Sequence, residues 1–173
     1  GMYLRRAFYR CTLDQCAADC YIGFGAMFTH PTARVDNGVF IGTYALIGSV
    51  WLQEGCLVGS RASLLSGGRQ HELGDDGKWS ATDIGRLEQI EIGANSWLGE
   101  GVVVMADVGP SAMVAVGAVV STRVPERVMV AGNPARFIRR LNLPEPEVRA
   151  GDNPSGAAPE GLGGDSATPK SET

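Results

Sequence analysis

The sequence contains two histidines, and one of them lies in a polar segment where an imidazole can serve as a catalyst. His71 stands in SGGRQHELGDDGKW, which is rich in glycine and charged side chains. Imidazole titrates near neutral pH, so a positioned histidine is a suitable general base toward a hydroxyl or an amine. The alternative is a solvated loop histidine without a role. A carboxylate often orients a catalytic imidazole, and the nearby candidates are Glu72, Asp75, Asp76, Asp83 and Glu88.

A repeat of six residues must position this histidine. An aliphatic residue with a small residue two places before it recurs mostly at steps of six, which fits neither a helix nor an ordinary strand. The repeat predicts short strands and tight corners, three to a triangular coil, in four to five coils stacked about 4.8 Å apart through parallel hydrogen bonds. The pairs are Cys20/Ile22, Ala26/Phe28, Ala33/Val35, Val39/Ile41, Ala45/Ile47, Val50/Leu52, Cys56/Val58, Ala62/Leu64, Ile90/Ile92, Ser96/Leu98, Val102/Val104, Ala112/Val114 and Ala118/Val120.

The corners and the interruption of the repeat carry further information. The pattern stops between Leu65 and Glu88, and a break in a solenoid is where a loop projects to build a site. His71 lies inside this break. Glycine follows the aliphatic residue at many corners, where a tight turn often requires a positive φ. These glycines are Gly23, Gly42, Gly48, Gly59, Gly93 and Gly99.

Both ends of the predicted stack need covers, because open ends expose unpaired strand edges. Leu4, Phe8 and Cys11 have roughly helical spacing and predict a helix that covers the first coil. Gly1 is left out, since Met2 is the expected native start. The expected division is an N-terminal cap at 2–20, a β-helix at 21–124 with a loop at 65–89, a C-terminal extension at 125–143 and a disordered tail at 144–173.

Composition excludes several classes of function. The tail holds six acidic and two basic residues, which leaves 13 of each in the body, so no basic patch indicates nucleic acid binding. No apolar run reaches the ~20 residues of a membrane span, and no signal peptide is evident, so we expect a cytoplasmic protein without a membrane partner. The four cysteines lack a C-x-x-C pair and are expected to be packing residues, not metal ligands: Cys11, Cys16, Cys20 and Cys56.

The stretch 90–138 carries a family resemblance. Its segments IEIGANSWLGEGVVVM, AVGAVVSTRVP and VMVAGNPARFI resemble the C-terminal half of the hexapeptide-repeat acyltransferases, which include the galactoside, maltose and serine acetyltransferases. The resemblance covers about residues 20–140 and is nearest to the polysaccharide and natural-product O-acetyltransferases. It implies an all-β fold, a left-handed parallel β-helix, assembled as a homotrimer with active sites between subunits. It also implies acetyl-CoA or another acyl-CoA as cosubstrate.

The resemblance assigns roles to individual residues. In the family, a histidine shortly after an SG segment at the mouth of the protruding loop is the catalytic base, and His71 matches it. Two features depart from the family pattern: Glu100 and Val116 stand where small residues are common along the cofactor groove, and MADVGPSAMVAVG is about two residues shorter than usual, which compresses a late coil. The implied coenzyme A contacts are Val116 and Gly117 through the backbone, Ser121 and Thr122 through polar groups, and Arg136 and Arg139 through phosphates.

Three further residues are candidates for substrate binding. By alternation Trp97 points outward, either as a trimer contact or as a wall of the acceptor or pantetheine channel. Trp79 lies on the loop and can touch substrate. His30 lies at a corner before a proline, either as a structural residue or in the acceptor pocket. The arginines of FIRR have an alternative role as a solvated end of the chain.

The expected reaction is acyl transfer to a hydroxyl of a sugar or a small natural product. The hydroxyl attacks the thioester directly, with a backbone N–H holding the oxyanion and no covalent enzyme intermediate. One alternative is N-acetylation of an amino sugar or nucleotide sugar, and another is a non-catalytic trimeric scaffold. The zinc carbonic anhydrases that share the β-helix need three histidine ligands, and the two histidines of this chain exclude such a site.

Overall fold

The computed structural model describes residues 1–68, 71–80 and 87–142. Asp83 and the predicted tail at 144–173 lie outside the described residues. No helix among the described residues combines the length and apolar character needed to cross a bilayer. The described unit is a β-helix that begins with one α-helix, α1 (Met2–Thr12).

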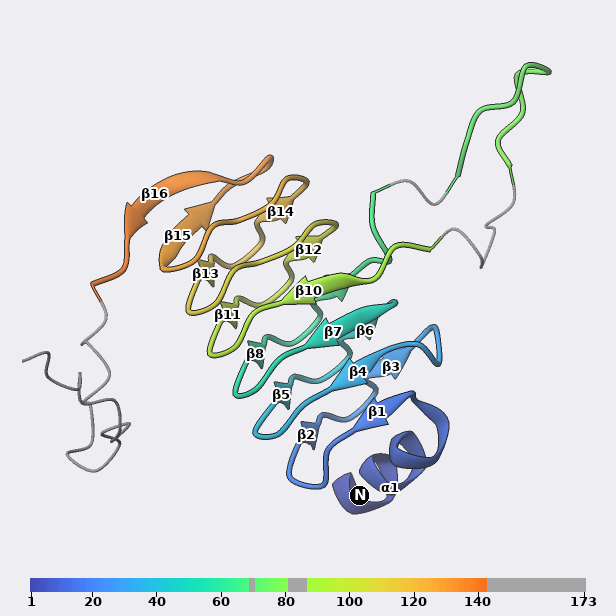
Figure 1. Cartoon of the computed structure of the whole chain (residues 1–173), viewed down its shortest axis with the longest axis vertical. Helices are drawn as coiled ribbons and strands as arrows, with labels where there is room; N and C mark the ends of the chain where they lie inside the picture. The colour runs from blue at the N-terminus through green and yellow to red at the C-terminus, as the bar shows by residue number, and fades with distance from the viewer. Residues whose placement is uncertain (69–70, 81–86, 143–173) are drawn as a thin grey trace, which may run out of the picture. The chain divides into compact units, whose positions relative to one another are not determined.

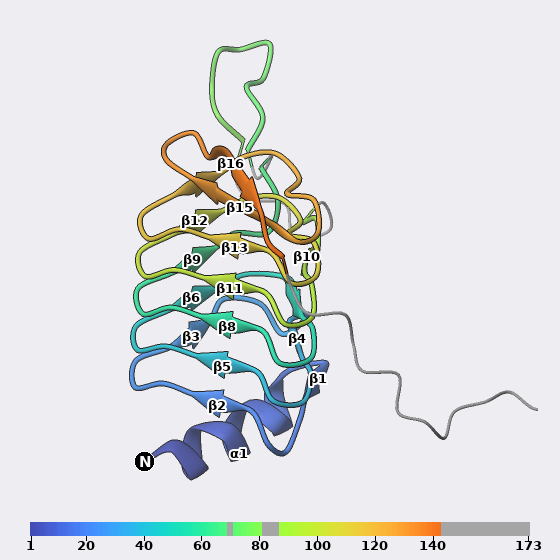
Figure 2. The same ribbon diagram turned by 90° about the vertical axis from the view of Figure 1, so that its left-hand side faces the viewer.

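The strands form the three faces of a left-handed coil, and successive strands visit the faces in turn (Figures 1 and 2). Sheet A contains β1 (Gln15–Cys16), β4 (Arg34–Val35), β7 (Val50–Leu52) and β10 (Ile90–Ile92). Sheet B contains β2 (Tyr21–Ile22), β5 (Phe40–Ile41), β8 (Leu57–Val58), β11 (Trp97–Leu98), β13 (Met113–Val114), β15 (Val128–Ala131) and β16 (Arg136–Arg140). Sheet C contains β3 (Met27–Phe28), β6 (Leu46–Ile47), β9 (Ser63–Leu64), β12 (Val103–Val104) and β14 (Val119–Val120).

The predicted fold class is confirmed, but the coil has about six turns, not four to five. The additional turn comes from β15, which stacks in parallel on β13. Its Val128 and Val130 are buried and repeat the small-then-aliphatic pattern beyond the last pair recognised in the sequence. Strand β16 then pairs antiparallel with β15 and ends the sheet.

The inward positions form one continuous core. Every residue of the predicted pairs is buried except Phe28, which is half-buried beside the cap. Equivalent residues of successive coils stack directly, as Ile47, Leu64 and Val104 do along sheet C. Each fully buried aliphatic side chain contributes about 1.5–3 kcal/mol relative to an exposed one. The six-residue spacing therefore corresponds to ladders of apolar side chains along the axis.

The corner glycines are required for a different reason than the sequence suggested. Gly59 is not among the residues with positive φ. A Cβ added to it would lie 2.6 Å from the backbone carbon of Gly99 in the next coil. The stacked corners thus approach too closely for a side chain, and steric room between coils, not a left-handed turn, selects glycine at this position.

The late coils are compressed, as expected. The segment 105–108 pairs with sheet A through one residue. Val108 forms isolated parallel bridges to Ile92 and Val124 and is not part of a regular strand. The backbone ladder nevertheless continues, since the amide of Gly93 donates to the carbonyl of Val108 at 2.7 Å. The shortened segment therefore pairs through one residue on this face and leaves the backbone ladder continuous.

Helix α1 covers the first coil with a different face from the one predicted. Leu4, Phe8 and Cys11 are exposed, so their predicted contact with the coil is wrong. Instead the Tyr9 hydroxyl donates to the carbonyl of Ala26 at 3.2 Å, and Arg5 Nε donates to the carbonyl of Ile22 at 3.1 Å. No further coil supplies donors at this end, so long side chains with polar tips satisfy the first-coil carbonyls.

A pair of substitutions in β10 tests the assignment of inward and outward positions. Ile92 is fully buried and its neighbour Glu91 is exposed. We expect Ile92→Ala to lower the free energy of unfolding by about 3 kcal/mol, because it leaves a cavity in the ladder. Glu91→Ala should change it by less than about 0.5 kcal/mol. Chemical denaturation at one protein concentration measures both, and equal effects would contradict the assignment.

Candidate active site

The break in the repeat between β9 and β10 contains a short hairpin. Leu73 and Trp79 form an antiparallel bridge, and the Ser80 amide donates to the carbonyl of Glu72 at 2.7 Å. The turn follows from the sequence GDDG, in which Gly77 has a φ of +73° and the Gly74 amide donates to the carbonyl of Lys78 at 2.9 Å. His71 therefore lies on a hydrogen-bonded hairpin.

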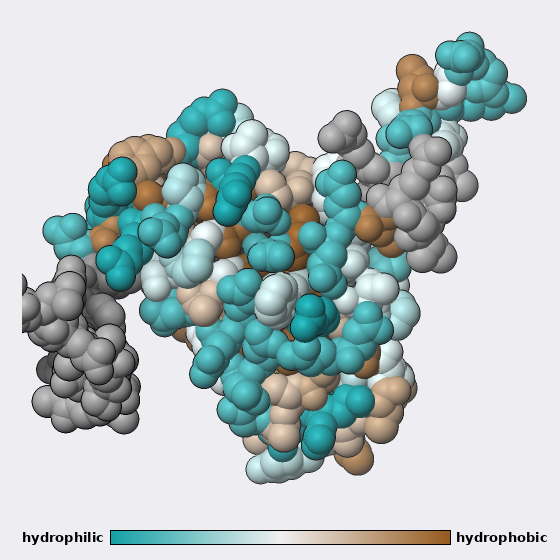
Figure 3. Space-filling view, in the orientation of Figure 1, coloured by the Kyte–Doolittle hydropathy of each residue, from teal (hydrophilic) through white to brown (hydrophobic). Residues whose placement is uncertain are grey.

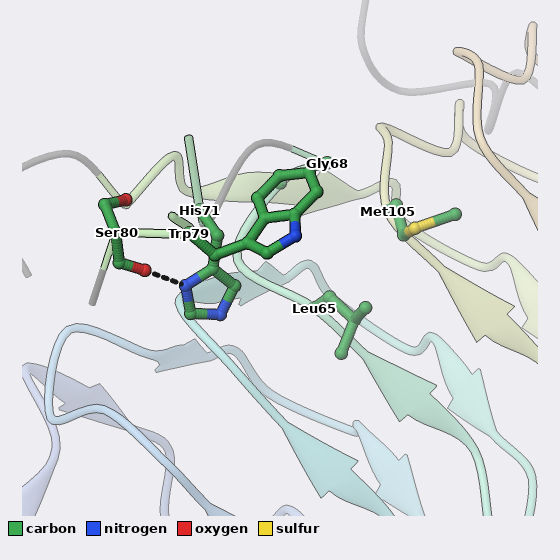
Figure 4. Close-up of a pocket in the computed structure, with 7 residues that line it drawn as sticks. Leu65, Gly68, His71, Trp79, Ser80 and Met105 are labelled. Carbon is green, nitrogen blue, oxygen red and sulfur yellow. Dashed lines mark hydrogen bonds between the residues drawn. The ribbon is translucent and has the colours of Figure 1, made fainter. Parts of the chain in front are cut away.

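The hairpin anchors the imidazole of His71. Its Nδ1 lies 2.9 Å from the carbonyl oxygen of Ser80, on the opposite side of the hairpin (Figure 4). A carbonyl can only accept, so Nδ1 donates and the neutral ring leaves Nε2 as an acceptor. A second bond reinforces the pairing, since the Glu72 amide donates to the Ser80 hydroxyl at 2.9 Å. The group bonded to Nδ1 is thus the backbone carbonyl of Ser80, while Asp83, one of the expected carboxylates, lies outside the described residues.

His71 and Trp79 border a cavity of about 600 Å³ together with residues of the β-helix. Leu65 and Met105 follow equivalent strands of sheet C in adjacent coils, and the Leu65 amide donates to the carbonyl of Val104 at 2.8 Å. Figure 4 shows the hairpin side chains on one side of the cavity and Leu65 and Met105 on the other. The lining residues are Leu65, Gly67, Gly68, His71, Trp79, Ser80 and Met105.

Two glycines allow the chain to leave the stack beside this cavity. Gly67 has a φ of +78°, and a Cβ there would lie 2.9 Å from the Cβ of Glu88. Gly68 faces open space, because an added Cβ would meet nothing within 4 Å. The backbone at the base of the hairpin is therefore accessible from the cavity, as a hydrogen-bond donor to a substrate must be.

The structure separates the substrate-binding candidates. Trp79 lines the His71 cavity and is 71% exposed. Trp97 is 50% exposed on the outer face of sheet B and does not line this cavity. His30 lies at the same corner of the coil as Leu65 but nearer to the N-terminus, in a different hollow of about 220 Å³ beside α1. Of these three candidates, Trp79 alone lines the cavity beside His71.

The expected coenzyme A contacts lie at both edges of sheet C in the late coils. Val116 and Gly117 occupy the corner between β13 and β14, where Val116 is 72% exposed. Ser121 and Thr122 follow β14, one coil beyond Met105, whose amide donates to the carbonyl of Val120 at 2.9 Å. They are exposed. This edge therefore continues from the cavity toward the C-terminal end.

The two predicted phosphate ligands lie on the exposed strand β16. Arg139 pairs with Met129 and Arg136 with Ala131 in the backbone register. Arg136 donates to the carbonyl of Ala135 at 3.1 Å. Neither guanidinium takes part in an ion pair with the described residues. Glu100, by contrast, lies at the corner between sheets B and C, where its carboxylate is 3.7 Å from the guanidinium of Arg61 in the adjacent coil.

Sequence reasoning missed the wall formed by Leu65 and Met105. Each directly follows the last inward aliphatic residue of sheet C in its coil, so aligning the coils before and after the break brings them together. Sequence reasoning also missed Ser80, whose role depends on its backbone carbonyl. No side-chain type reveals such a role.

The cysteines form no metal site with the other residues that the structure describes. Cys20 and Cys56 are buried as predicted, and burial raises the pKa of Cys56 to about 12. Cys11 is exposed on α1, so its prediction as a packing residue is wrong. Cys16 is half-buried.

Comparisons with known proteins agree with this fold. No family model matches the chain. Serine acetyltransferases 4 and 2 of Arabidopsis thaliana are 34% and 33% identical to it over 123 residues, 69% of this chain. The match spans only 31% and 34% of those relatives, so the chain covers about a third of their length.

Two solved structures share the fold at low sequence identity. The maltose O-acetyltransferase of Clostridium difficile 630 has a TM-score of 0.63 at 17% identity, over 80% of this chain and 75% of that one. A galactoside acetyltransferase in complex with coenzyme A has a TM-score of 0.65 at 18% identity, over 80% of this chain and 70% of that one. The resemblance seen in the sequence is thus confirmed for the repeat and the fold.

The hydrogen bond of His71 predicts one tautomer. The neutral ring should carry its proton on Nδ1, because Ser80 offers only a carbonyl oxygen to it. Nitrogen-15 NMR of the imidazoles distinguishes the two tautomers, and a His30→Gln variant assigns the remaining signals to His71. A neutral ring protonated on Nε2 would contradict the geometry.

Proposed function

We propose that this chain, a member by its repeat and its fold of the hexapeptide-repeat acyltransferases, transfers an acetyl group from acetyl-CoA to a hydroxyl of a sugar or a small natural product. The observation that carries the proposal is the anchored imidazole of His71 at the edge of a cavity. Its Nδ1 is engaged by the Ser80 carbonyl, so Nε2 is the nitrogen that accepts a proton from the acceptor.

The reaction follows from one positioned base and one hydrogen-bond donor. Nε2 of His71 takes the hydroxyl proton as the oxygen attacks the thioester carbonyl. The tetrahedral oxyanion needs a donor, and the accessible backbone at Gly68 can supply an N–H. Collapse of the intermediate breaks the carbon–sulfur bond, and the imidazolium returns its proton to the leaving thiolate. No side chain becomes acylated.

The lining of the cavity bears on the acceptor. Leu65, Met105 and Trp79 give it an apolar wall opposite and above His71. An indole supports a sugar ring or an aromatic body by contact with its face. The relatives named above are two serine acetyltransferases, a maltose O-acetyltransferase and a galactoside acetyltransferase, and the name of the maltose enzyme specifies transfer to oxygen. Transfer to oxygen is therefore favoured over N-acetylation of an amino sugar or nucleotide sugar.

The edge of sheet C supports a path for the cosubstrate. The galactoside acetyltransferase with a similar fold was solved with coenzyme A. In this chain the exposed backbone at Val116 and Gly117 and the hydroxyls of Ser121 and Thr122 offer contacts along a pantetheine arm. The guanidiniums of Arg136 and Arg139, which form no ion pair with the described residues, are suited to its phosphates, because their planar fork donates two hydrogen bonds.

The outer face of sheet B supports assembly into a homotrimer. Trp97 lies between Leu57 and Met113 in a column of outward apolar side chains. Large apolar columns of this kind usually mark protein interfaces. The outward face of sheet A is mostly hydrophilic by contrast (Figure 3). The complete column is Tyr21, Phe40, Leu57, Trp97, Met113 and Met129.

Replacement of His71 tests the catalytic role. His71→Ala should reduce acetyl-CoA consumption by about 10²–10⁴-fold, because it removes the base that accepts the hydroxyl proton. Release of free coenzyme A is measured with sugars, amino sugars and serine as acceptors. Thermal stabilisation by acetyl-CoA should persist in the variant. His30→Gln serves as the matched histidine control and should retain activity, whereas near-normal turnover by His71→Ala would refute the role.

The oligomeric state tests the proposed interface. Trp97→Glu places a charge in the middle of the apolar column and should dissociate the trimer at micromolar concentration, because a buried unpaired carboxylate is costly. Glu91→Lys on sheet A changes charge on another face and should leave the trimer intact. Sedimentation velocity measures both variants. A monomeric parent chain would exclude the interface.

A further inference from the structure

Two thiols meet at the N-terminal end of the β-helix, which helix α1 covers. Cys16 is the second residue of β1, and Cys20 directly precedes β2, so both belong to the first corner between sheets A and B. Their Sγ atoms are 3.6 Å apart, and either can donate to the other. In the next coil the equivalent positions hold Val35 and Val39. The fold itself therefore does not require sulfur at these positions.

The pair is accessible from one side only. Cys20 is 2% exposed, whereas Cys16 is half-buried and lines a cavity of about 390 Å³ with polar neighbours. The hydrogen bond from Cys16 lowers the pKa of Cys20, and the same contact together with burial raises the pKa of Cys16. Loss of one proton from the pair is thus eased by the neighbouring thiol. A small oxidant can reach the pair through Cys16.

We propose that Cys16 and Cys20 are a reversible dithiol–disulfide site, oxidised by a small hydroperoxide, that ties the first strand of the β-helix to the second. One sulfur, as the thiolate, attacks an oxygen of the peroxide and breaks the O–O bond, which gives a sulfenic acid. The second sulfur displaces hydroxide from that sulfenic acid and forms the S–S bond. Two thiols supply two electrons and two protons, and hydrogen peroxide leaves as two molecules of water.

The other cysteines do not compete for this bond. Cys56 occupies the position of Cys20 two coils further along, about 10 Å away at the spacing of stacked strands. Disulfides require Cα atoms within about 7 Å. Cys11 is exposed on α1 and has no thiol contact among the described residues. This site is independent of the acyl transfer proposed above.

Peroxide treatment of the full chain tests the site. We expect free thiols to fall from the four of the reduced chain to two, and the intact mass to fall by about 2 Da. Cleavage before Asp14, Asp19 and Asp36 separates the relevant cysteines, and the expected product joins peptide 14–18 to peptide 19–35. Dithiothreitol should restore the four thiols. Retention of four thiols, a bridge to Cys11 or Cys56, or oxygen addition alone would overturn the proposal.

Valine variants separate the disulfide from a general effect of oxidation. Cys16→Val and Cys20→Val each introduce the residue that the next coil has at the same position, so both variants should fold. Neither should show the loss of about 2 Da within a single chain on peroxide treatment. Oxidised parent chain should melt about 5 °C higher than reduced chain, because the bond restrains the unfolded state. Cys11→Ser is the matched thiol control and should retain both the mass loss and the shift. An equal shift of the melting temperature in the valine variants would refute the Cys16–Cys20 disulfide.

Discussion

Stacking of one coil on the next is the interaction on which the rest of this molecule depends. The strands of one coil do not pair with each other. Their backbone amides and carbonyls are satisfied by the coils above and below, as the amides of Ser63 and Leu65 donate to the carbonyls of Val102 and Val104. The same register places Leu64 on Ile47 in the apolar ladder. Hydrogen bonding and burial thus require the same repeat, and a single coil is not stable alone.

This constraint also explains how the chain accommodates an active-site hairpin. The residues after β9 leave the stack, and β10 returns in register with β7, so the ladder continues without a gap. Leu65 and Met105 then lie one coil apart beside the break. The rigid coils supply one wall of the cavity, and the hairpin supplies His71 and Trp79. Variation in such a loop need not disturb the core.

The same repeat leaves distinct tasks to the ends and faces of the stack. At the first coil, Arg5 and Tyr9 satisfy carbonyls that no further strand can pair. Their involvement turns the apolar residues Leu4 and Phe8 outward. The Cys16–Cys20 contact lies at this same end, where only a helix covers the interior. The outer faces of the sheets differ in polarity, because outward side chains do not take part in the apolar ladders. Sheet B carries apolar residues on its outer face and sheet A carries mainly polar ones.

The inward half of the molecule was predictable from the chain alone. Pairs such as Ala62/Leu64 repeat at steps of about six residues, which fits neither a helix nor an ordinary strand and therefore predicts a stack of coils with these side chains inside. The break around His71 was visible for the same reason. The tertiary structure alone revealed the Ser80 carbonyl, the Leu65 and Met105 wall, and the rotation of α1. Those features depend on backbone groups and on contacts between coils distant in sequence, which leave no periodic signal in residue type.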